Sequence, residues 1–292
     1  MIELEVAVTK RGRVQTYKRT LPSGWDDIQS EKSALYCLRQ LSFRPLNQAQ
    51  LACGMYFLDL PVSLRNLLST TQHADIIQAM SWMNLEAGPR PLITSFRHKG
   101  QTYHLPATKF ANGAAKEYPI ADDYYTRFLE GDVKCLDHLV GTLARPENRN
   151  EETSAKLGDK RQPLLSRADA EKRGDLLTAV PLEVKLAVLM YFAGAKKYVN
   201  ETYGEWLFQA PEQPDEEQED DDVEIYKQEA SSGGVMFGWW GIFMDVAESG
   251  VFGNLDQVHQ TNFHSICMYL VKKKNEEKEL QRQTPSPAGK ES

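Results

Sequence analysis

The feature that most constrains this chain is an acidic run in its last third. Nine aspartates and glutamates fall within residues 212–224, and carboxylates this closely spaced repel one another and are not packed into an apolar core. We therefore expect residues 209–232 to form a flexible linker. On that basis the chain divides into a body over 1–208 and a C-terminal unit over 233–275, followed by a disordered polar tail over 276–292.

Aromatic and apolar residues dominate the C-terminal unit. Residues 238–244 read Gly-Trp-Trp-Gly-Ile-Phe-Met, and a helix over Gly241–Ala247 is expected to end at the glycines that follow it. After a short turn over Asn254–His259, Thr261 and Asn262 are in position to cap a last helix. Apolar residues recur in that helix at i, i+3, i+4, i+7 and i+8, which predicts a single apolar stripe. The stripe consists of Phe263, Ile266, Cys267, Leu270 and Val271.

The aromatic block at 238–244 has two interpretations. Buried aromatic residues dominate ordinary protein cores, which favours a core helix with a flexible entry. Aromatic residues also dominate the energetics of interfaces, and the block follows the expected linker, which favours an anchor for a partner. The second interpretation predicts a partner-binding set made of the large residues in and just after the block. The set is Trp239, Trp240, Phe243, Met244 and Phe252.

The body is predicted to be mainly α-helical with two small β-hairpins, an α+β fold. Residues 1–20 alternate in the manner of paired strands, and residues 92–105 form the second hairpin. The polar, apolar-poor stretch 145–161 is expected to be an exposed loop. Helices are expected in most of the remainder. The main ones begin near Asp26 or Asp27 and cover Asn47–Asp59, Asp122–Leu129, Lys134–Leu143, Leu182–Phe192 and Tyr198–Phe208.

The second hairpin carries a candidate nucleic-acid surface. Within residues 90–109, Arg97, Lys99, Tyr103 and Lys109 combine positive charge with an aromatic ring, and that combination binds single strands by charge and stacking. A plain amphipathic hairpin explains the same residues. The net charge of −7 also argues against an extended nucleic-acid footprint. A nucleic-acid-associated accessory role is therefore the alternative function.

Catalytic and metal-binding motifs are not found. The chain has no G-x-S-x-G, H-E-x-x-H, phosphate loop or G-x-G-x-x-G. His98 and His104 lack a third ligand for zinc, and the carboxylates of the acidic run do not alternate as in a calcium loop. His264 and Cys267 have the spacing of a base and a nucleophile, but Cys267 lies in the apolar stripe. We expect no enzyme, metal or cofactor; a site that converges only in space is a third interpretation.

Cysteine usage and hydropathy bear on the compartment. Cys37, Cys53, Cys135 and Cys267 are far apart and form no C-x-x-C pair, so we expect reduced, buried thiols. No apolar run approaches 18 residues, and the first residues lack the apolar core of a signal peptide. These observations predict a cytoplasmic protein without a membrane partner.

Three parts of the chain together carry a family resemblance. They are the opening hairpin that leads to the segment Leu-Pro-Ser-Gly-Trp-Asp-Asp at 21–27, the helical middle with Leu182–Phe192, and the closing block from Gly238 to Leu270. The arrangement resembles the phage and prophage proteins of tail-assembly-chaperone type. The resemblance implies a non-enzymatic protein of the host cytoplasm that shields an aggregation-prone partner, such as a tape-measure protein, during tail assembly.

Overall fold

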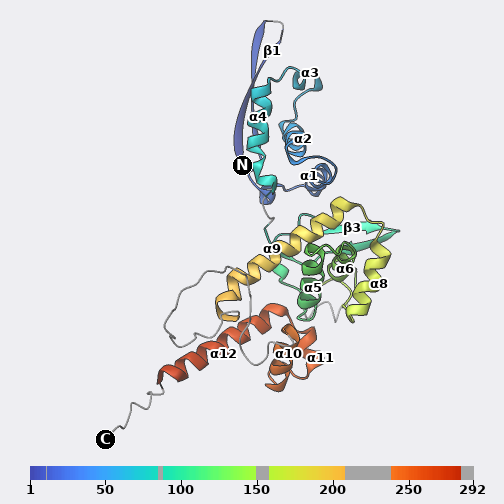
Figure 1. The fold of residues 1–292 in the computed structure, drawn as a ribbon, viewed down its shortest axis with the longest axis vertical. Coiled ribbons are helices and arrows are strands. Elements are labelled where there is room, and N and C mark those ends of the chain that lie inside the picture. Colours follow the sequence, from blue (N-terminus) through green and yellow to red (C-terminus); the bar gives the residue numbers. More distant parts are fainter. Residues whose placement is uncertain (11, 85–87, 149–157, 208–237, 284–292) are drawn as a thin grey trace, which may run out of the picture. The chain divides into compact units, whose positions relative to one another are not determined.

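The structure is a computed structural model that describes residues 1–10, 12–84, 88–148, 158–207 and 238–283. It is mainly α-helical with two small antiparallel sheets, of two and three strands (Figure 1). The predicted fold class is therefore confirmed.

The chain divides into two compact units. The first unit contains residues 1–110 and 120–197, and the second contains residues 111–119 and 198–292. The first unit thus ends at Lys197, ahead of residue 208, where the sequence analysis places the end of the body. The segment expected as a linker, 209–232, lies outside the described residues.

The first unit opens with a long hairpin, in which β1 (Ile2–Lys10) pairs antiparallel with β2 (Arg13–Leu21). Side chains of β1 alternate between the two faces, and Val6 and Val8 are buried. The Gln72 side-chain amide donates a hydrogen bond of 2.6 Å to the Ala7 carbonyl oxygen, which ties the hairpin to α4 (Thr70–Ala79). A period of two with one buried face is what the alternation in the sequence predicts.

Short helices follow the hairpin. They are η1 (Trp25–Asp27), α1 (Glu31–Phe43), α2 (Leu46–Leu58), α3 (Val62–Arg65), α4 (Thr70–Ala79) and η2 (Ser81–Asn84). Helix α1 begins at Glu31 with Ser30 as its cap, so the predicted start near Asp26 or Asp27 is wrong. The reason is local: the Asp27 carboxylate accepts hydrogen bonds from the Ser23 backbone N–H (2.7 Å) and the N-terminal ammonium (2.8 Å). These bonds hold residues 23–27 in a turn of their own.

The rest of the first unit combines a second, three-stranded sheet with helices. The strands β3 (Ser95–His98), β4 (Gln101–His104) and β5 (Arg145–Pro146) pair in that order, so the predicted second hairpin gains a third strand. The other elements are η3 (Thr108–Phe110), α5 (Glu117–Leu129), α6 (Lys134–Leu143), α8 (Arg167–Leu177) and α9 (Leu182–Leu207). Helix α6 has the predicted bounds, whereas α9 joins two predicted helices into one that extends to the second unit.

The predicted exposed loop 145–161 is wrong at both of its described ends. Arg145 and Arg161 are 0% and 2% exposed, and Asp159 is 6% exposed. Arg161 donates through Nε and Nη2 to the Asp159 carboxylate, and through Nη1 to the Leu143 carbonyl oxygen at 2.8 Å. Arg145 Nη2 lies 3.5 Å from the same carboxylate. Buried charges are tolerated here because they are paired and hydrogen-bonded.

The second unit consists of the end of α9, α10 (Trp239–Glu248), α11 (Leu255–Gln260), α12 (Phe263–Gln283) and the segment 111–119. That segment joins because Ala115 N–H donates to the Thr261 carbonyl oxygen (2.8 Å) and the Gly113 carbonyl accepts from Phe263 N–H (3.0 Å). Ala115, Phe243, Val246, Val258 and Ile266 form the buried core.

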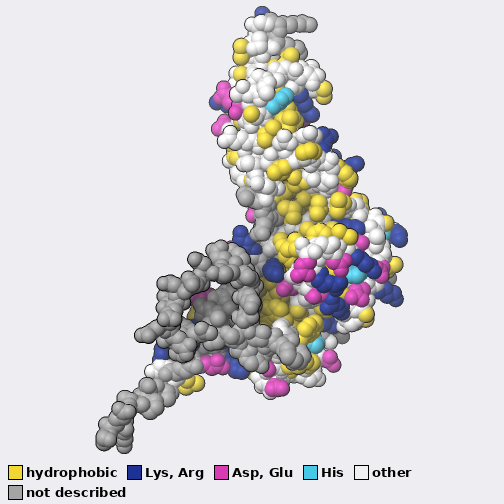
Figure 2. Space-filling model, in the orientation of Figure 1, with side chains coloured by type: hydrophobic (Ala, Val, Ile, Leu, Met, Phe, Trp, Pro, Cys, Tyr) yellow, Lys and Arg dark blue, Asp and Glu magenta, His cyan; other side chains and the backbone are white. Residues whose placement is uncertain are grey.

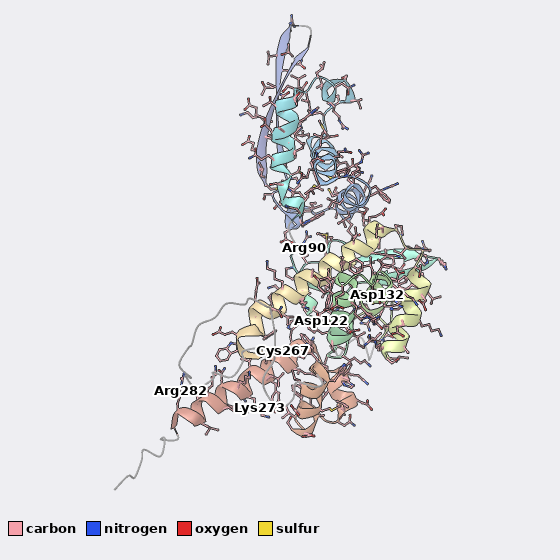
Figure 3. All side chains as sticks on the ribbon, viewed as in Figure 1. Arg90, Asp122, Asp132, Cys267, Lys273 and Arg282 are labelled. Atoms are coloured by element: carbon pink, nitrogen blue, oxygen red, sulfur yellow. The ribbon has the colours of Figure 1, made fainter. Side chains whose placement is uncertain are left out.

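Helix α12 is longer than the sequence analysis allows. It runs to Gln283, past the start of the disordered tail predicted at residue 276; of that predicted tail, residues 284–292 lie outside the described residues. Good helix formers and the i,i+4 pair of Lys272 with Glu276 (3.6 Å) explain the extension. In Figure 3, Cys267, Lys273 and Arg282 mark successive positions along this helix.

All four cysteines are buried and free, as predicted. Within the described ranges, no helix combines the length and the apolar character needed to span a bilayer.

Candidate partner-binding surface

The aromatic block forms the first helix of the second unit after the undescribed segment. Gly238 precedes α10 with φ 51° and ψ −133°, a left-handed backbone that favours a residue without a Cβ. Helix α10 begins directly afterwards, at Trp239, two residues before the predicted start. Gly238 therefore allows the backbone to turn directly before the two tryptophans.

Three of the predicted partner-binding residues belong to the interior packing of the unit. Phe243 is fully buried, and Trp239 and Phe252 are partly buried against the same core. The Trp239 ring centroid lies 5.1 Å from that of Phe263 and 5.6 Å from that of Tyr118. Edge-to-face contacts of this kind add to the burial of apolar area. For these three residues the core interpretation of the block is the appropriate one.

The other two predicted residues, Trp240 and Met244, are exposed. Their relative exposures are 38% and 47%, and they are four residues apart, which places them on one face of α10. The Trp240 ring meets Phe243 and His259 edge-on, at centroid distances of 6.0 and 5.4 Å. One part of the indole therefore packs against these two rings, while the rest stays exposed to solvent. We call this pair the α10 surface.

His259 supports the α10 surface from α11. Burial lowers the pKa of its imidazole, the charge of Lys116 lowers it further, and Asp256 opposes the shift. The Nε2 atom is buried without a hydrogen-bond partner, which is consistent with a neutral ring. A neutral imidazole packs against the edges of Trp240 and Phe243 without bringing a charge into the aromatic cluster.

The predicted nucleic-acid residues do not converge on one face. In the β3–β4 register Arg97 stands opposite Thr102, and Phe96 opposite Tyr103, so Arg97 and Tyr103 point to opposite faces of the hairpin. The Tyr103 ring stacks on Phe96 at 5.5 Å. The two lysines are exposed and lie outside the strands: Lys99 is in the turn, with φ 46°, and Lys109 is in η3, with φ 61°.

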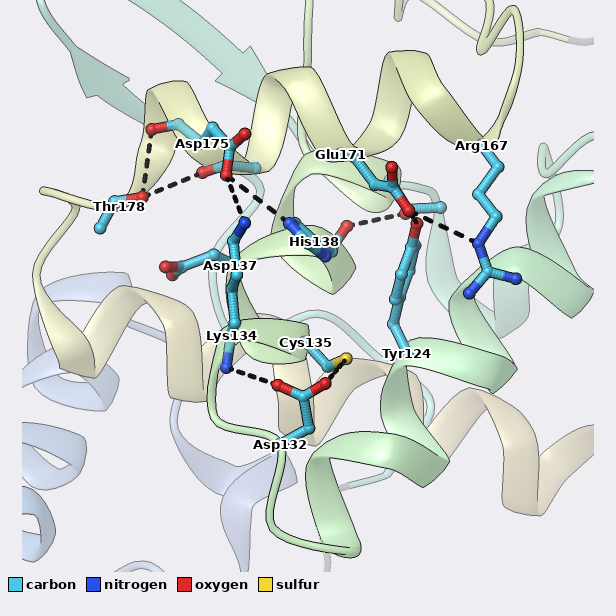
Figure 4. A network of polar contacts seen from close by, with 12 residues as sticks. Tyr124, Asp132, Lys134, Cys135, Asp137, His138, Arg167, Glu171, Asp175 and Thr178 are labelled. Carbon is cyan, nitrogen blue, oxygen red and sulfur yellow. Dashed lines mark hydrogen bonds and ion pairs between the residues drawn. The ribbon is translucent and has the colours of Figure 1, made fainter.

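A polar network on α5, α6 and α8 was missed by sequence reasoning (Figure 4). His138, 8% exposed, has its Nε2 atom 3.7 Å from an Asp175 carboxylate oxygen, and Lys134 Nζ is 3.4 Å from the same atom. Nearby, the Tyr124 hydroxyl donates to Glu171 at 3.0 Å. Burial and this hydrogen bond raise the pKa of Tyr124. Charged side chains of both signs gather over α6 and α8 in Figure 2.

This network has the character of a structural cross-link. Asp175 pairs with Lys134 of α6, Glu171 pairs with Arg167 of its own helix, and the Lys185 ammonium lies 2.5 Å from the Asp137 carboxylate. No cluster of three or more His, Cys, Asp or Glu residues suited to a metal ion occurs in the part of the chain that is described. The sequence signal for it is the group of charged residues Arg167, Asp169 and Glu171 at the start of α8. The sequence does not show which helix they face, because that depends on tertiary packing.

The pair His264 and Cys267 is likewise part of the packing. Burial raises the pKa of the Cys267 thiol to about 12, which suppresses the nucleophilic thiolate. His264 Nδ1 is 3.0 Å from the Tyr203 hydroxyl oxygen. Neither residue therefore has the arrangement of a nucleophile and its base.

Comparisons of the chain with protein-family models, curated proteins and solved structures give no match.

Proposed function

We propose that this chain is a non-enzymatic binding protein that holds a protein partner on the α10 surface. The observation that carries the proposal is the exposure of Trp240 and Met244, one helical turn apart, at 38% and 47%. Tryptophan is enriched among the residues that dominate interface energetics, and truncating such a residue costs about 2 kcal/mol or more of binding free energy. Methionine adapts to irregular partner surfaces because its side chain is flexible and polarizable.

The ring contacts of Trp240 strengthen the proposal. Phe243 and His259 contact the indole edge-on, so its orientation is set before a partner arrives. A pre-positioned aromatic side chain loses less conformational entropy on binding than a mobile one. Trp240 therefore meets the requirements of an anchor residue, with Met244 extending the apolar contact along the helix.

The more specific proposal is an assembly-chaperone role in phage tail assembly, in the host cytoplasm. An exposed apolar pair suits a protein that covers apolar segments of a partner, such as a tape-measure protein, until assembly. Nucleic acid fits this chain less well as a partner, because Arg97 and Tyr103 point to opposite faces of their hairpin.

Co-expression with the products of neighbouring genes tests the binding role. The partner should co-purify with the wild-type chain and with Leu176→Ala, which removes an exposed apolar side chain (55%) in the other unit. It should be lost with Trp240→Ala/Met244→Ala. Equal retention by that double variant rejects the α10 surface as the binding site.

The chaperone role needs its own readout. The soluble fraction of the partner should rise on co-expression with the wild-type chain and stay low with Trp240→Ala/Met244→Ala. A partner that binds but is equally soluble in both cases supports a binding protein and contradicts a chaperone.

A further inference from the structure

The charge around the α10 surface identifies the kind of partner segment that fits it. No lysine or arginine occurs between Lys227 and Lys272. Within that interval the described charged side chains are Asp245, Glu248 and Asp256, all exposed. His259, the imidazole of α11, has its pKa lowered by burial. Helices α10 and α11 therefore carry carboxylates as their only full charges at neutral pH.

The carboxylates lie next to the apolar pair. Trp240, Met244 and Glu248 follow one another at intervals of four residues, so they form one stripe along α10. Asp245 is exposed beside Met244. The sequence that precedes α10 has the same sign: from Tyr198 to Gly238 there are twelve carboxylates and one lysine. Every charged side chain on α10 is therefore negative, and Lys116 of the segment 111–119 is a cation that acts on His259 of α11.

We infer that the α10 surface binds a basic, amphipathic helical segment of a protein partner, with apolar residues that cover Trp240 and Met244 and flanking lysines or arginines that meet Asp245 and Glu248. This inference rests on the proposed function and adds the chemistry of the partner. A helix is the segment that presents apolar side chains at i and i+4 against a matching helical pair. Opposite charges at the rim set the partner's identity and its association rate.

Other occupants fit less well. Anionic membranes and nucleic acids carry the same sign as Asp245 and Glu248, so they are repelled. A second copy could offer the lysines at 272–274, but the apolar stripe of that helix is already buried in its own unit at Phe263, Ile266 and Cys267. The large apolar side chains that α12 still exposes, Met268 and Leu280, are twelve positions apart, so they form no adjacent pair to match Trp240 and Met244.

Two labelled 18-residue peptides test the inference. They share one face of leucines, and their polar face is lysine in one peptide and glutamate in the other. Binding to the full chain is measured by fluorescence anisotropy at low and at moderate salt. The lysine peptide should bind at least tenfold more tightly than the glutamate peptide, and its affinity should fall with salt because exposed charges are screened beyond about 10 Å at 0.1 M salt.

Variants separate the two contributions to binding. Asp245→Asn/Glu248→Gln should weaken the lysine peptide about fivefold, since two rim charges are removed. Glu277→Gln/Glu279→Gln removes the same charge from exposed positions on α12 and should change the affinity less than twofold. Both variants replace exposed side chains, so thermal unfolding should confirm that they fold.

The outcomes distinguish the inference from the proposed function. Equal affinity for both peptides, lost in Trp240→Ala/Met244→Ala, leaves the binding surface in place and overturns the basic partner. Binding that the tryptophan and methionine substitutions leave unchanged contradicts both. Dimerisation of the wild-type chain that this double variant abolishes makes a second copy the occupant and also overturns the inference.

Discussion

Gly141 on α6 and Gly174 on α8 lie backbone against backbone: a Cβ atom at Gly141 would stand 2.4 Å from the Gly174 nitrogen and 2.4 Å from the Ala170 carbonyl oxygen. The clash involves backbone atoms on a helix, which cannot rotate away as a side chain can. The close approach also places Gly174 beside His138, whose ring carbon would be 2.8 Å from a Cβ on Gly174. The two glycines thus determine how closely α6 and α8 pack.

Gly141→Ala should therefore destabilise the first unit. Alanine gains up to about 1 kcal/mol over glycine in a helix interior, but overpacking against rigid backbone costs about 1–3 kcal/mol or more. We expect a net loss of about 2 kcal/mol in urea unfolding. Gly24→Ala is the control, since Gly24 has extended backbone and nothing within 4 Å of a Cβ. A Gly141→Ala variant as stable as the wild type would mean that the helices can separate without loss.

Local patterns predicted much of the fold. The helix at Lys134–Leu143 has its predicted bounds, and the apolar stripe that begins at Phe263 is buried at its first three positions. Both are amphipathic segments whose pattern directly reflects which face meets the core. The buried Arg145 and Arg161 were missed because their partner, Asp159, makes burial favourable only once the chain has brought the three together.

The sequence predicted only part of the candidate surface. The aromatic block indicated that large side chains gather near Trp239, but not which of them face solvent. Phe243 is buried and Met244 exposed because α10 packs one side against Val258 and Ile266. The support of Trp240 by His259 joins two helices, and a contact of that kind has no signature in local sequence.

The buried ion pair between Lys185 and Asp137 gives a second prediction. The two side chains are 11% and 14% exposed, and Lys185 also donates to the Thr178 carbonyl oxygen at 2.8 Å. Lys185→Met leaves a largely buried carboxylate without its cation, so unfolding free energy should fall by about 3 kcal/mol. Asp137→Leu/Lys185→Met should lose less than the single variant because no isolated charge is left.

An exposed pair provides the matching control. Lys272 and Glu276 are 75% and 59% exposed, so Lys272→Met should change stability by less than about 0.5 kcal/mol. If the loss of unfolding free energy in Asp137→Leu/Lys185→Met instead equalled the sum of the losses in Asp137→Leu and in Lys185→Met, the two groups would not interact in the folded protein.

His259 predicts that the stability of the folded chain depends on pH. Burial and the Lys116 charge lower the pKa of this imidazole in the folded state, so the unfolded chain takes up the proton first as pH falls below about 6.5. The contribution of His259 to stability is then present above that pH and is lost as pH decreases towards the folded pKa. His259→Gln removes the titration. Unfolding midpoints at pH 7.5 and 5 should differ less in the variant, and parallel changes would show that the folded imidazole titrates normally.

The buried thiols predict that the cysteines of the folded chain resist chemical labelling. Burial and the hydrogen bond to Asp132 raise the pKa of Cys135 to about 11, and burial raises that of Cys267 to about 12. Because the thiolate is the reactive form, a chromogenic disulfide reagent at pH 8 should label no cysteine in the folded chain. All four should react in denaturant. Fast labelling of one thiol under native conditions would place that residue in a part of the fold that opens readily.

The division of the aromatic block between core and surface can be tested with two neighbouring residues. Phe243→Ala removes a fully buried ring from among Ala115, Val246 and Val258 and should lower unfolding free energy by about 3–5 kcal/mol. Met244→Ala shortens a side chain that is 47% exposed and should change it by less than about 1 kcal/mol. Met244→Ala should weaken partner capture without unfolding the unit, because its apolar contact lies on the α10 surface. Comparable losses of stability in both variants would mean that Met244 is packed inside the protein, and the α10 surface would then lose half of its apolar area.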